Sequence, residues 1–245
     1  MNRLVFSAEQ VVAAASETVL RVRVSGRQLT HLHDVHRAQL GDSLRVGQLH
    51  GKLGQATVSE LTAHYAELDV TLADQPPPKA GITLLLALPR PKMLKRIVQM
   101  VTTLGIDELV LLNSYRVEKS YWQTPFLKAE ALQEQLLLGL EQAGDTIPPT
   151  ITLAQRFKPF VEDELPALLQ GKQGFVAHPT QDALACPSDL DEKLLITIGP
   201  EGGFIPYEFE KLQAAGLQAI HLGPRILRVE TAVPVILGRM RGYSV

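Results

Sequence analysis

The chain has 245 residues, of which 45% are hydrophobic and 20% are charged, and its net charge at pH 7 is −2. This length supports one large domain or two modest ones, and the balanced charge does not mark the whole chain as a nucleic-acid binder, although a local basic patch is compatible with it. The one cysteine, Cys186, excludes an internal disulfide and a cysteine-built zinc site. With a poor secretory signal at its start and no apolar run of about 18 residues, the chain is predicted to be cytoplasmic and without a membrane span.

Short segments of alternating apolar and polar residues fill the first 73 positions. This period of two predicts the strands of a small β barrel or sandwich, over residues 19–25, 43–49, 54–61 and 66–73. Three consecutive prolines follow within residues 73–81, and they favour a stiff, extended connection. The sequence therefore predicts a first domain over residues 1–73 and a linker over residues 74–81.

From residue 82 onward, strand-like runs alternate with helical patterns. The continuous apolar run 82–88 predicts a strand buried on both faces, and apolar residues at helical spacing from Leu94 to Leu104 follow it. A helix is also predicted from Pro206 to Gly216. Further strands are expected at 106–113, 174–178, 194–199 and 217–223. The alternation predicts an α/β domain over residues 82–245, with a parallel sheet covered by helices.

Three of these predicted strands end in unusual loops, at residues 177–180, 199–203 and 222–232. Glycine allows backbone to approach a ligand closely, so such loops at the carboxyl edge of a parallel sheet suit an adenosine or a phosphate. Tight turns alone are the alternative explanation for any one loop. Three loops at one edge, the last carrying Arg225, favour a ligand site. The chain has neither a phosphate-loop motif nor a G-x-G-x-x-G motif, which disfavours a P-loop nucleotidase and a Rossmann dehydrogenase.

The sequences IGPEGGF (198–204) and LGPRILRVETA (222–232) closely resemble the paired motifs of the RsmE family of 16S rRNA (uracil-N3) methyltransferases, which belong to the SPOUT class. HLHDVHRAQLGD (31–42) is similar to the N-terminal stretch of the same family, so the resemblance extends over nearly the whole chain. It implies a SPOUT-type parallel sheet with a C-terminal trefoil knot, preceded by a PUA-like β-barrel RNA-binding domain. It also implies a homodimer that acts on 16S rRNA or the 30S subunit.

The resemblance implies that S-adenosyl-L-methionine is the cofactor and that the three loops hold it. Ile226 and Leu227 are expected to flank the adenine ring, while main-chain groups contact its edge. Glu201 is expected to hold loop amides or a ribose hydroxyl, or else to cap the following helix. The implied cofactor-binding residues are His178, Pro179, Ile198, Gly199, Pro200, Glu201, Gly202, Gly203, Leu222, Gly223, Ile226, Leu227 and Arg228.

The implied reaction asks for two catalytic functions. The protein must align a nitrogen with the methyl group, and uracil N3 must lose a proton before it becomes a good nucleophile. We interpret Arg228 as the cation that stabilises the resulting oxyanion, because a guanidinium stays charged and donates in a fork. Glu230 is expected either to orient Arg228, to take part in proton removal, or only to cap the following helix.

Basic residues in two further segments are candidate RNA contacts. Residues 89–96 and 114–122 combine cations with aromatic rings, which together suit phosphate contacts and base stacking. A solvated charged face is the alternative. With Arg37 from the N-terminal motif, the candidates are Arg90, Lys92, Lys95, Arg96, Arg116 and Lys119. His31, His33 and His36 form a cluster, but the family match accounts for His31 without a metal, so no metal is expected.

Two places depart from the family pattern. Met100 and Thr103 stand where the family commonly has lysine and glutamate, and Asp145 stands where it has arginine after the retained Glu141 and Gln142. These positions are expected near an RNA or dimer surface. They leave open a divergent paralogue that acts on another RNA, or a non-catalytic RNA-binding or ribosome-assembly protein.

Overall fold

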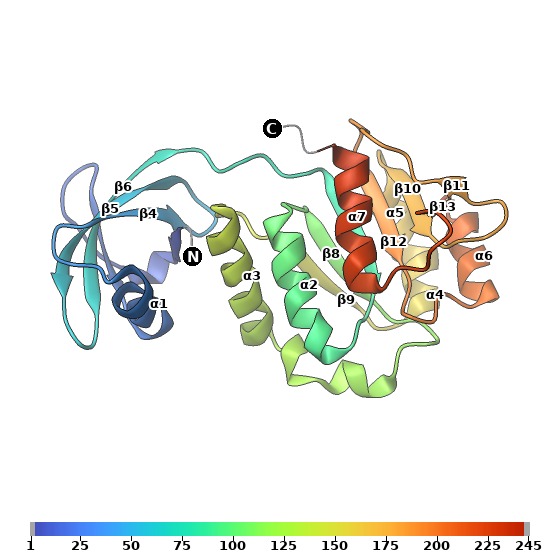
Figure 1. Cartoon of the computed structure of the whole chain (residues 1–245), viewed down its shortest axis with the longest axis horizontal. Coiled ribbons are helices and arrows are strands. Elements are labelled where there is room, and N and C mark those ends of the chain that lie inside the picture. Colours follow the sequence, from blue (N-terminus) through green and yellow to red (C-terminus); the bar gives the residue numbers. More distant parts are fainter. Residues whose placement is uncertain (1–2, 243–245) are drawn as a thin grey trace. The chain divides into compact units, whose positions relative to one another are not determined.

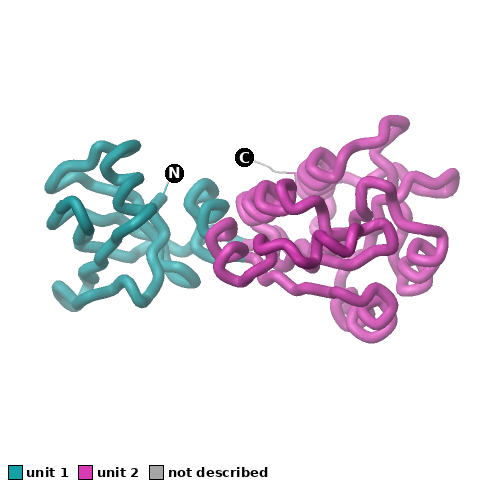
Figure 2. The backbone as a smooth tube through the Cα atoms, turned by 90° about the horizontal axis from the view of Figure 1, so that it is seen from below, with its two compact units in different colours: residues 1–78, 137–148 teal, residues 79–136, 149–245 magenta. Residues whose placement is uncertain are grey.

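The computed structural model describes residues 3–242, which form two compact units. Figure 2 colours the first unit, Met1–Pro78 with Leu137–Pro148, and the second, Lys79–Leu136 with Pro149–Val245. The domains predicted from the sequence are consecutive segments, whereas each compact unit is discontinuous. Within the described residues, no helix has the length and apolar character needed to cross a membrane.

The first unit is built on one six-stranded sheet. Its core includes Phe6, Val22, Val46 and Leu68, which recur on alternate positions of their strands as the period of two predicts. Its strands, in the order β1-β4-β5-β6-β3-β2, pair antiparallel except for the parallel pair β1 and β4. They are β1 (Leu4–Phe6), β2 (Val11–Ala14), β3 (Leu20–Val24), β4 (Ser43–Gln48), β5 (Leu53–Leu61) and β6 (Ala66–Asp74). The sequence predicted four of the six and missed the short β1 and β2.

The second unit contains a fully parallel seven-stranded sheet, which confirms the predicted α/β architecture. Its order is β11-β13-β10-β12-β7-β8-β9, so the chain runs outward from β7 in one direction and later fills the other side. The strands are β7 (Ile82–Ala87), β8 (Glu108–Leu112), β9 (Thr150–Ala154), β10 (Gln173–Ala177), β11 (Leu184–Ala185), β12 (Leu194–Ile198) and β13 (Gln218–His221). The sequence predicted all but β9 and β11. Such a reversal of strand order is where parallel sheets commonly bind ligands.

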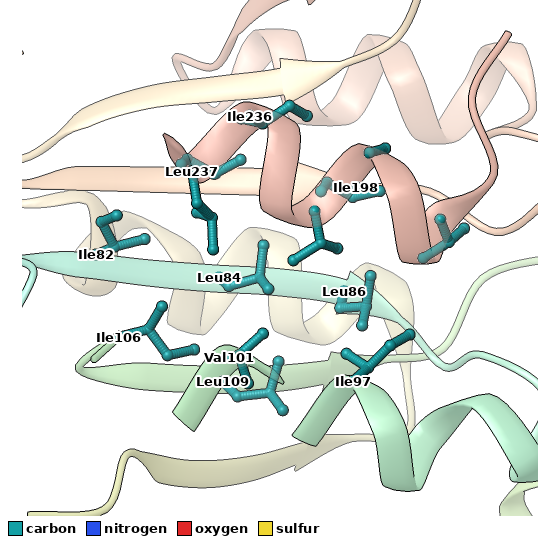
Figure 3. Close-up of a cluster of buried hydrophobic side chains, with 14 of the residues drawn as sticks. Ile82, Leu84, Leu86, Ile97, Val101, Ile106, Leu109, Ile198, Ile236 and Leu237 are labelled. Atoms are coloured by element: carbon teal, nitrogen blue, oxygen red, sulfur yellow. The ribbon is translucent and has the colours of Figure 1, made fainter. Parts of the chain in front are cut away.

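Helices cover both faces of this sheet. Figure 1 shows α2 (Pro91–Thr103) and α7 (Val229–Arg241) side by side on one face. Their apolar sides meet Leu84, Leu86 and Ile198 from the strands, and Figure 3 shows this cluster. The other face packs against α5 (Leu165–Leu169) and α6 (Pro206–Ala214) through residues such as Leu85 and Leu195. All residues of β7 and β12 are buried, as their continuous apolar sequence predicts.

The helix α3 (Ala129–Ala143) crosses the boundary between the units, because its residues from Leu137 onward belong to the first. Glu141 is only 2% exposed, and it accepts two hydrogen bonds from Arg27, which lies in α1 (Gly26–His31). Asp145 was expected near an RNA or dimer surface, but it is not itself exposed in the chain. Its side chain is buried and accepts the N–H groups of Thr146 and Ile147 at 2.6 and 3.0 Å, so it stabilises the turn after α3.

Candidate active site

The three loops singled out in the sequence meet at one edge of the parallel sheet. They follow β10, β12 and β13, and β10 pairs directly with both of the other strands. Between the loops lies a cavity of about 270 Å³. The shared direction of the strands therefore brings together segments that are far apart in sequence.

Every predicted cofactor residue except Arg228 lines this cavity. The wall also contains residues that the sequence reasoning missed, although two signals would have found several of them. One signal is position at a strand end, and the other is helical spacing along α7, whose Val229, Ala232 and Ile236 recur every three or four residues. The lining residues outside the predicted cofactor set are Ala177, Ile220, His221, Arg225, Val229, Ala232 and Ile236. Of these, Ala177, Arg225, Val229 and Ala232 lie in loops that the sequence had already singled out.

The loop Gly199–Gly203, which we name the cofactor loop, forms a tight turn. The N–H of Gly203 donates to the carbonyl of Pro200 at 2.8 Å, and Gly203 has φ of +71°, a region that favours glycine. The side chain of Glu201 is 41% exposed, and its Oε1 lies 3.5 Å from Arg90 Nε. Glu201 therefore pairs with a cation predicted to contact RNA, and it does not cap the next helix.

A different glutamate, Glu208, caps that helix. Its Oε2 accepts the N–H of Ile205 at 3.1 Å, directly before α6. The same carboxylate accepts the hydroxyl of Ser114 at 3.1 Å and the N–H of Tyr115 at 2.7 Å. Glu208 is only 3% exposed, and these three donors satisfy a carboxylate that would otherwise be costly to bury.

The side chain of Arg116 is exposed, but it also contacts the cofactor loop. Its Nη1 donates to the carbonyl oxygen of Gly202 and lies 3.5 Å from that of Gly203. A Cβ atom placed on Gly202 would be 3.0 Å from Arg116 Cδ, so glycine leaves room for the arginine stem.

His178 brings an aromatic ring to the same corner. Its ring centroid is 4.4 Å from that of Phe209, and a Cβ on Gly203 would be 3.6 Å from its Cε1. Burial, and secondly the nearby Arg116 charge, lowers the pKa of His178 below its ordinary value of 6.5. The neutral imidazole is therefore favoured in the folded chain.

The third loop holds the predicted catalytic residues. Gly223 has φ of +98°, and its N–H donates to His221 Nδ1 at 3.0 Å, which fixes the start of the loop. Arg228 is 86% exposed along its side chain and lies 3.9 Å from Glu230. Glu230 stands in the first turn of α7, which begins after Arg228. Ile226 is 91% exposed, so it forms only the rim of the cavity.

The other predicted RNA contacts lie in the second unit, except Arg37, which lies in the first unit. Lys95 lies 4.2 Å from the centre of the Phe126 ring. Lys92, Arg96 and Lys119 are exposed, and no ion pair holds them within residues 3–242. Arg37 is exposed and adopts a left-handed backbone conformation with φ of +49°. These four cations are free to meet a phosphate.

A family model described as an RNA methyltransferase domain matches residues 76–241. This match covers the parallel sheet, the three loops and α7, so the fold and the cavity define the class as RNA methyltransferases.

Full-length relatives narrow the class. Ribosomal RNA small subunit methyltransferase E of Treponema pallidum is 30% identical over 239 residues, covering 95% of this chain and 87% of the relative. Its namesake in Synechocystis sp. is 29% identical over 242 residues, covering 97% and 76%. The chain belongs to this family of ribosomal RNA small subunit methyltransferases E, the RsmE family.

Solved structures share the fold. A ribosomal RNA small subunit methyltransferase E from Neisseria gonorrhoeae, bound to S-adenosyl methionine, superposes with a TM-score of 0.74 at 21% identity, over 97% of this chain and 95% of that one. The methyltransferase Lpg2936 from Legionella pneumophila, in complex with the same cofactor, gives 0.75 at 18% identity, over 97% and 96%. At these identities the likeness establishes the architecture of the chain.

Proposed function

We propose that the protein uses S-adenosyl-L-methionine to methylate N3 of a uridine in 16S rRNA of the small ribosomal subunit. The observation that carries this proposal is the cavity between the three loops, in a chain of the RsmE family. Its volume of about 270 Å³ is close to the lower end of the roughly 300–1,000 Å³ common for ligand pockets.

The residues at the cavity fit the cofactor. Ile198, Ile220 and Leu227 offer apolar surface for an adenine ring, and the glycines of the cofactor loop leave main-chain groups accessible. When bound, S-adenosyl-L-methionine supplies a sulfonium methyl group that is already a strong donor. The chain therefore has to bind, orient and prepare the uracil nitrogen, and little more.

Arg228 and Glu230 are the proposed catalytic residues. Once N3 of uracil loses its proton, negative charge spreads to the ring oxygens, and an exposed guanidinium such as that of Arg228 stabilises it. Glu230, 3.9 Å away, orients that guanidinium or accepts the proton.

The wider assembly is part of the same proposal. We propose that the first unit is a PUA-like RNA-binding domain, that the second is a SPOUT domain with a C-terminal trefoil knot, and that two chains form a homodimer in the cytoplasm without a metal. The exposed cations Arg37, Lys92, Arg96 and Lys119 are the proposed RNA contacts. An experimental structure with a continuous chain trace would test the knot, and light scattering would test the dimer.

Two of the three departures from the family pattern do not call for another target. Met100 packs against the hydrophobic core, and Asp145 is a buried turn residue, so neither change removes a group from an open RNA surface. Thr103 is exposed, and its hydroxyl donates to the carbonyl of Gln99. Another RNA, or a non-catalytic role, is kept as an outcome of the test.

The test combines calorimetry with nucleoside mass spectrometry. Wild-type protein is expected to bind S-adenosyl-L-methionine and to form 3-methyluridine in 30S subunits from a strain that lacks this modification. Arg228→Ala is expected to lower kcat by about 100- to 1,000-fold, as for loss of an oxyanion-stabilising group, with little change in cofactor affinity because Arg228 does not line the cavity. Lys193→Ala is the control, since Lys193 is exposed and precedes β12 at the opposite end from the cofactor loop.

Absence of cofactor binding by the folded wild type would overturn the proposal that the protein is an enzyme. Binding with methylation of another nucleoside would overturn the uridine target alone.

A further inference from the structure

The cofactor loop and the loop after β8 have no direct backbone connection through the sheet. The first follows β12 and the second follows β8, and β7 lies between these strands. Among the described residues no main-chain hydrogen bond joins the two loops, so the hydrogen bonds that link them involve side chains. Two side chains, those of Glu208 and Arg116, span this gap.

Glu208 fixes the loop after β8 at its beginning. Its carboxylate accepts the Ser114 hydroxyl and the Tyr115 N–H, and its remaining hydrogen bond comes from Ile205 at the start of α6. One buried group thus ties residues 114–115 to the helix that follows the cofactor loop. Because the main chain is held at Tyr115, the position of the Arg116 backbone is restricted.

Arg116 continues from that point onto the cofactor loop. Its guanidinium contacts the carbonyl oxygens of Gly202 and Gly203, and its stem passes close to the Cα of Gly202. Among the described residues, no carboxylate forms an ion pair with Arg116. The carbonyl oxygens of the loop are therefore its protein partners, and they accept charge-assisted hydrogen bonds.

A carbonyl held in this way fixes the peptide plane to which it belongs. Gly202 and Gly203 both line the cavity, so fixing their carbonyls sets part of the wall that a ligand meets. Preorganising a binding loop raises affinity, because the ordering cost is not incurred at the moment of binding. Arg116 is in this respect different from Lys92, Arg96 and Lys119, which have no such partner.

We propose that Arg116 is a positioning residue that preorganises the cofactor loop, and that Glu208 is the buried anchor that directs it there. This assigns Arg116 to cofactor binding and not to the RNA contact expected from the sequence. The inference rests on the proposed function, since it takes the cavity to be the S-adenosyl-L-methionine site.

The experiment measures cofactor and RNA parameters separately in Arg116→Ala, using calorimetry for the Kd of S-adenosyl-L-methionine and steady-state kinetics on 30S subunits for KM. We expect the Kd to rise about tenfold, equivalent to about 1.4 kcal/mol, while KM for the subunit at saturating cofactor changes less than about twofold. Arg116→Lys, which keeps the charge but not the fork, should recover only part of the affinity. The control is Lys128→Ala, an exposed cation in the same connecting segment that should leave the Kd unchanged.

A rise in KM for the subunit with an unchanged cofactor Kd would overturn the inference, because it is the result expected of an RNA contact. Failure of the wild type to bind the cofactor would instead overturn the proposed function, so the two failures are distinguishable.

Glu208→Gln tests the anchor. It should raise the cofactor Kd in the same direction, and the double variant with Arg116→Ala should be no worse than the weaker-binding single variant, since both act on one contact. If folded Glu208→Gln protein has a lower melting temperature and an unchanged Kd, the anchor role is wrong. A third readout is the titration of His178 by NMR, whose pKa should rise in Arg116→Ala when the neighbouring charge is removed.

Discussion

The two sheets differ in where their polar groups lie. In the first unit, charged side chains stand on a sheet face and pair across strands, as Arg23 does with Glu67 at 2.6 Å and Arg21 with Asp69 at 2.9 Å. In the second unit the strands β7 and β12 are buried throughout, and the polar residues of the cavity lie at the carboxyl ends of β10, β12 and β13.

This difference shows where a ligand site can arise. Side chains that neighbour one another in an antiparallel sheet satisfy one another, and they leave little for a ligand. Among the described residues, the buried strands β7 and β12 form no such cross-strand pairs, and the loops present main-chain groups that only a few side chains, such as Arg116, hold in place. The variants below test this contrast between paired charges that maintain stability and loop geometry that maintains binding.

The largest expected effect is on a paired charge. Arg27→Ala should lower the free energy of unfolding by about 2 kcal/mol, because it leaves the buried Glu141 without its bidentate partner. Burial already raises the pKa of Glu141 despite the opposing effect of Arg27. Urea unfolding measures the loss, and cofactor affinity should not change. Arg23→Ala is the comparison, with a smaller loss because Arg23 is exposed and Arg21 also lies 3.8 Å from Glu67. Equal losses of unfolding free energy in the two variants would contradict the distinction between a buried and an exposed ion pair.

A matched pair of glycines separates loop geometry from strain. Gly203 and Gly171 both have φ of +71°, so alanine at either position should cost about 1–2 kcal/mol of stability. Only Gly203 lines the cavity, and only Gly203→Ala should weaken cofactor binding, by about tenfold or about 1.4 kcal/mol. Calorimetry and thermal unfolding of both variants decide the matter. Weaker binding in Gly171→Ala would show that strain alone is responsible.

A buried hydroxyl in β12 offers a smaller effect of opposite sign. Thr197 is fully buried, and its hydroxyl has no hydrogen-bond partner among the described residues. Thr197→Val should therefore raise the free energy of unfolding by about 1 kcal/mol, since it removes an unsatisfied polar group at nearly constant volume. Chemical denaturation measures the gain. A loss of stability would mean that a bound water satisfies the hydroxyl.

The smallest effect concerns pH. Burial, followed by the Arg116 charge, holds the pKa of His178 below 6.5 in the folded chain. The unfolded chain then binds the proton more readily, so stability falls as the pH drops through 6.5 toward the folded pKa. Urea midpoints at pH 7.5 and pH 5.5 should differ less in His178→Gln than in the wild type. An identical difference in both proteins would exclude His178 as a source of the pH dependence.

Local sequence predicted the elements whose pattern is strong. The glycine-rich loops and the wholly apolar strands stood out, whereas β9 was missed because its mostly exposed or half-buried residues give a weak pattern, and β11 because it has only two residues. The predicted cofactor residues that line the cavity followed from motifs that are contiguous in the chain, whereas Ile220, His221 and Ile236 lie outside those loops.

Contacts between distant segments were beyond local reasoning. Glu208 and Ser114 are 94 positions apart, and Arg116 and Gly202 are 86 apart, so no spacing rule connects them. The sequence consequently placed Arg116 with the RNA-facing cations and considered Glu201, not Glu208, as a possible cap of α6. Asp145 was placed at a surface because only its departure from the family was visible, and not the turn that buries it.

The division of α3 between the two units has a consequence for biosynthesis. Residues Leu137–Pro148 complete the first unit, yet they follow Pro78 by a long stretch of chain that belongs to the second. As translation proceeds at about 5–20 residues per second, the 70 residues from Pro78 to Pro148 take roughly 4–14 seconds to emerge. During that interval Arg27 lacks its partner Glu141. The first unit therefore cannot complete its fold until part of the second unit has been synthesised.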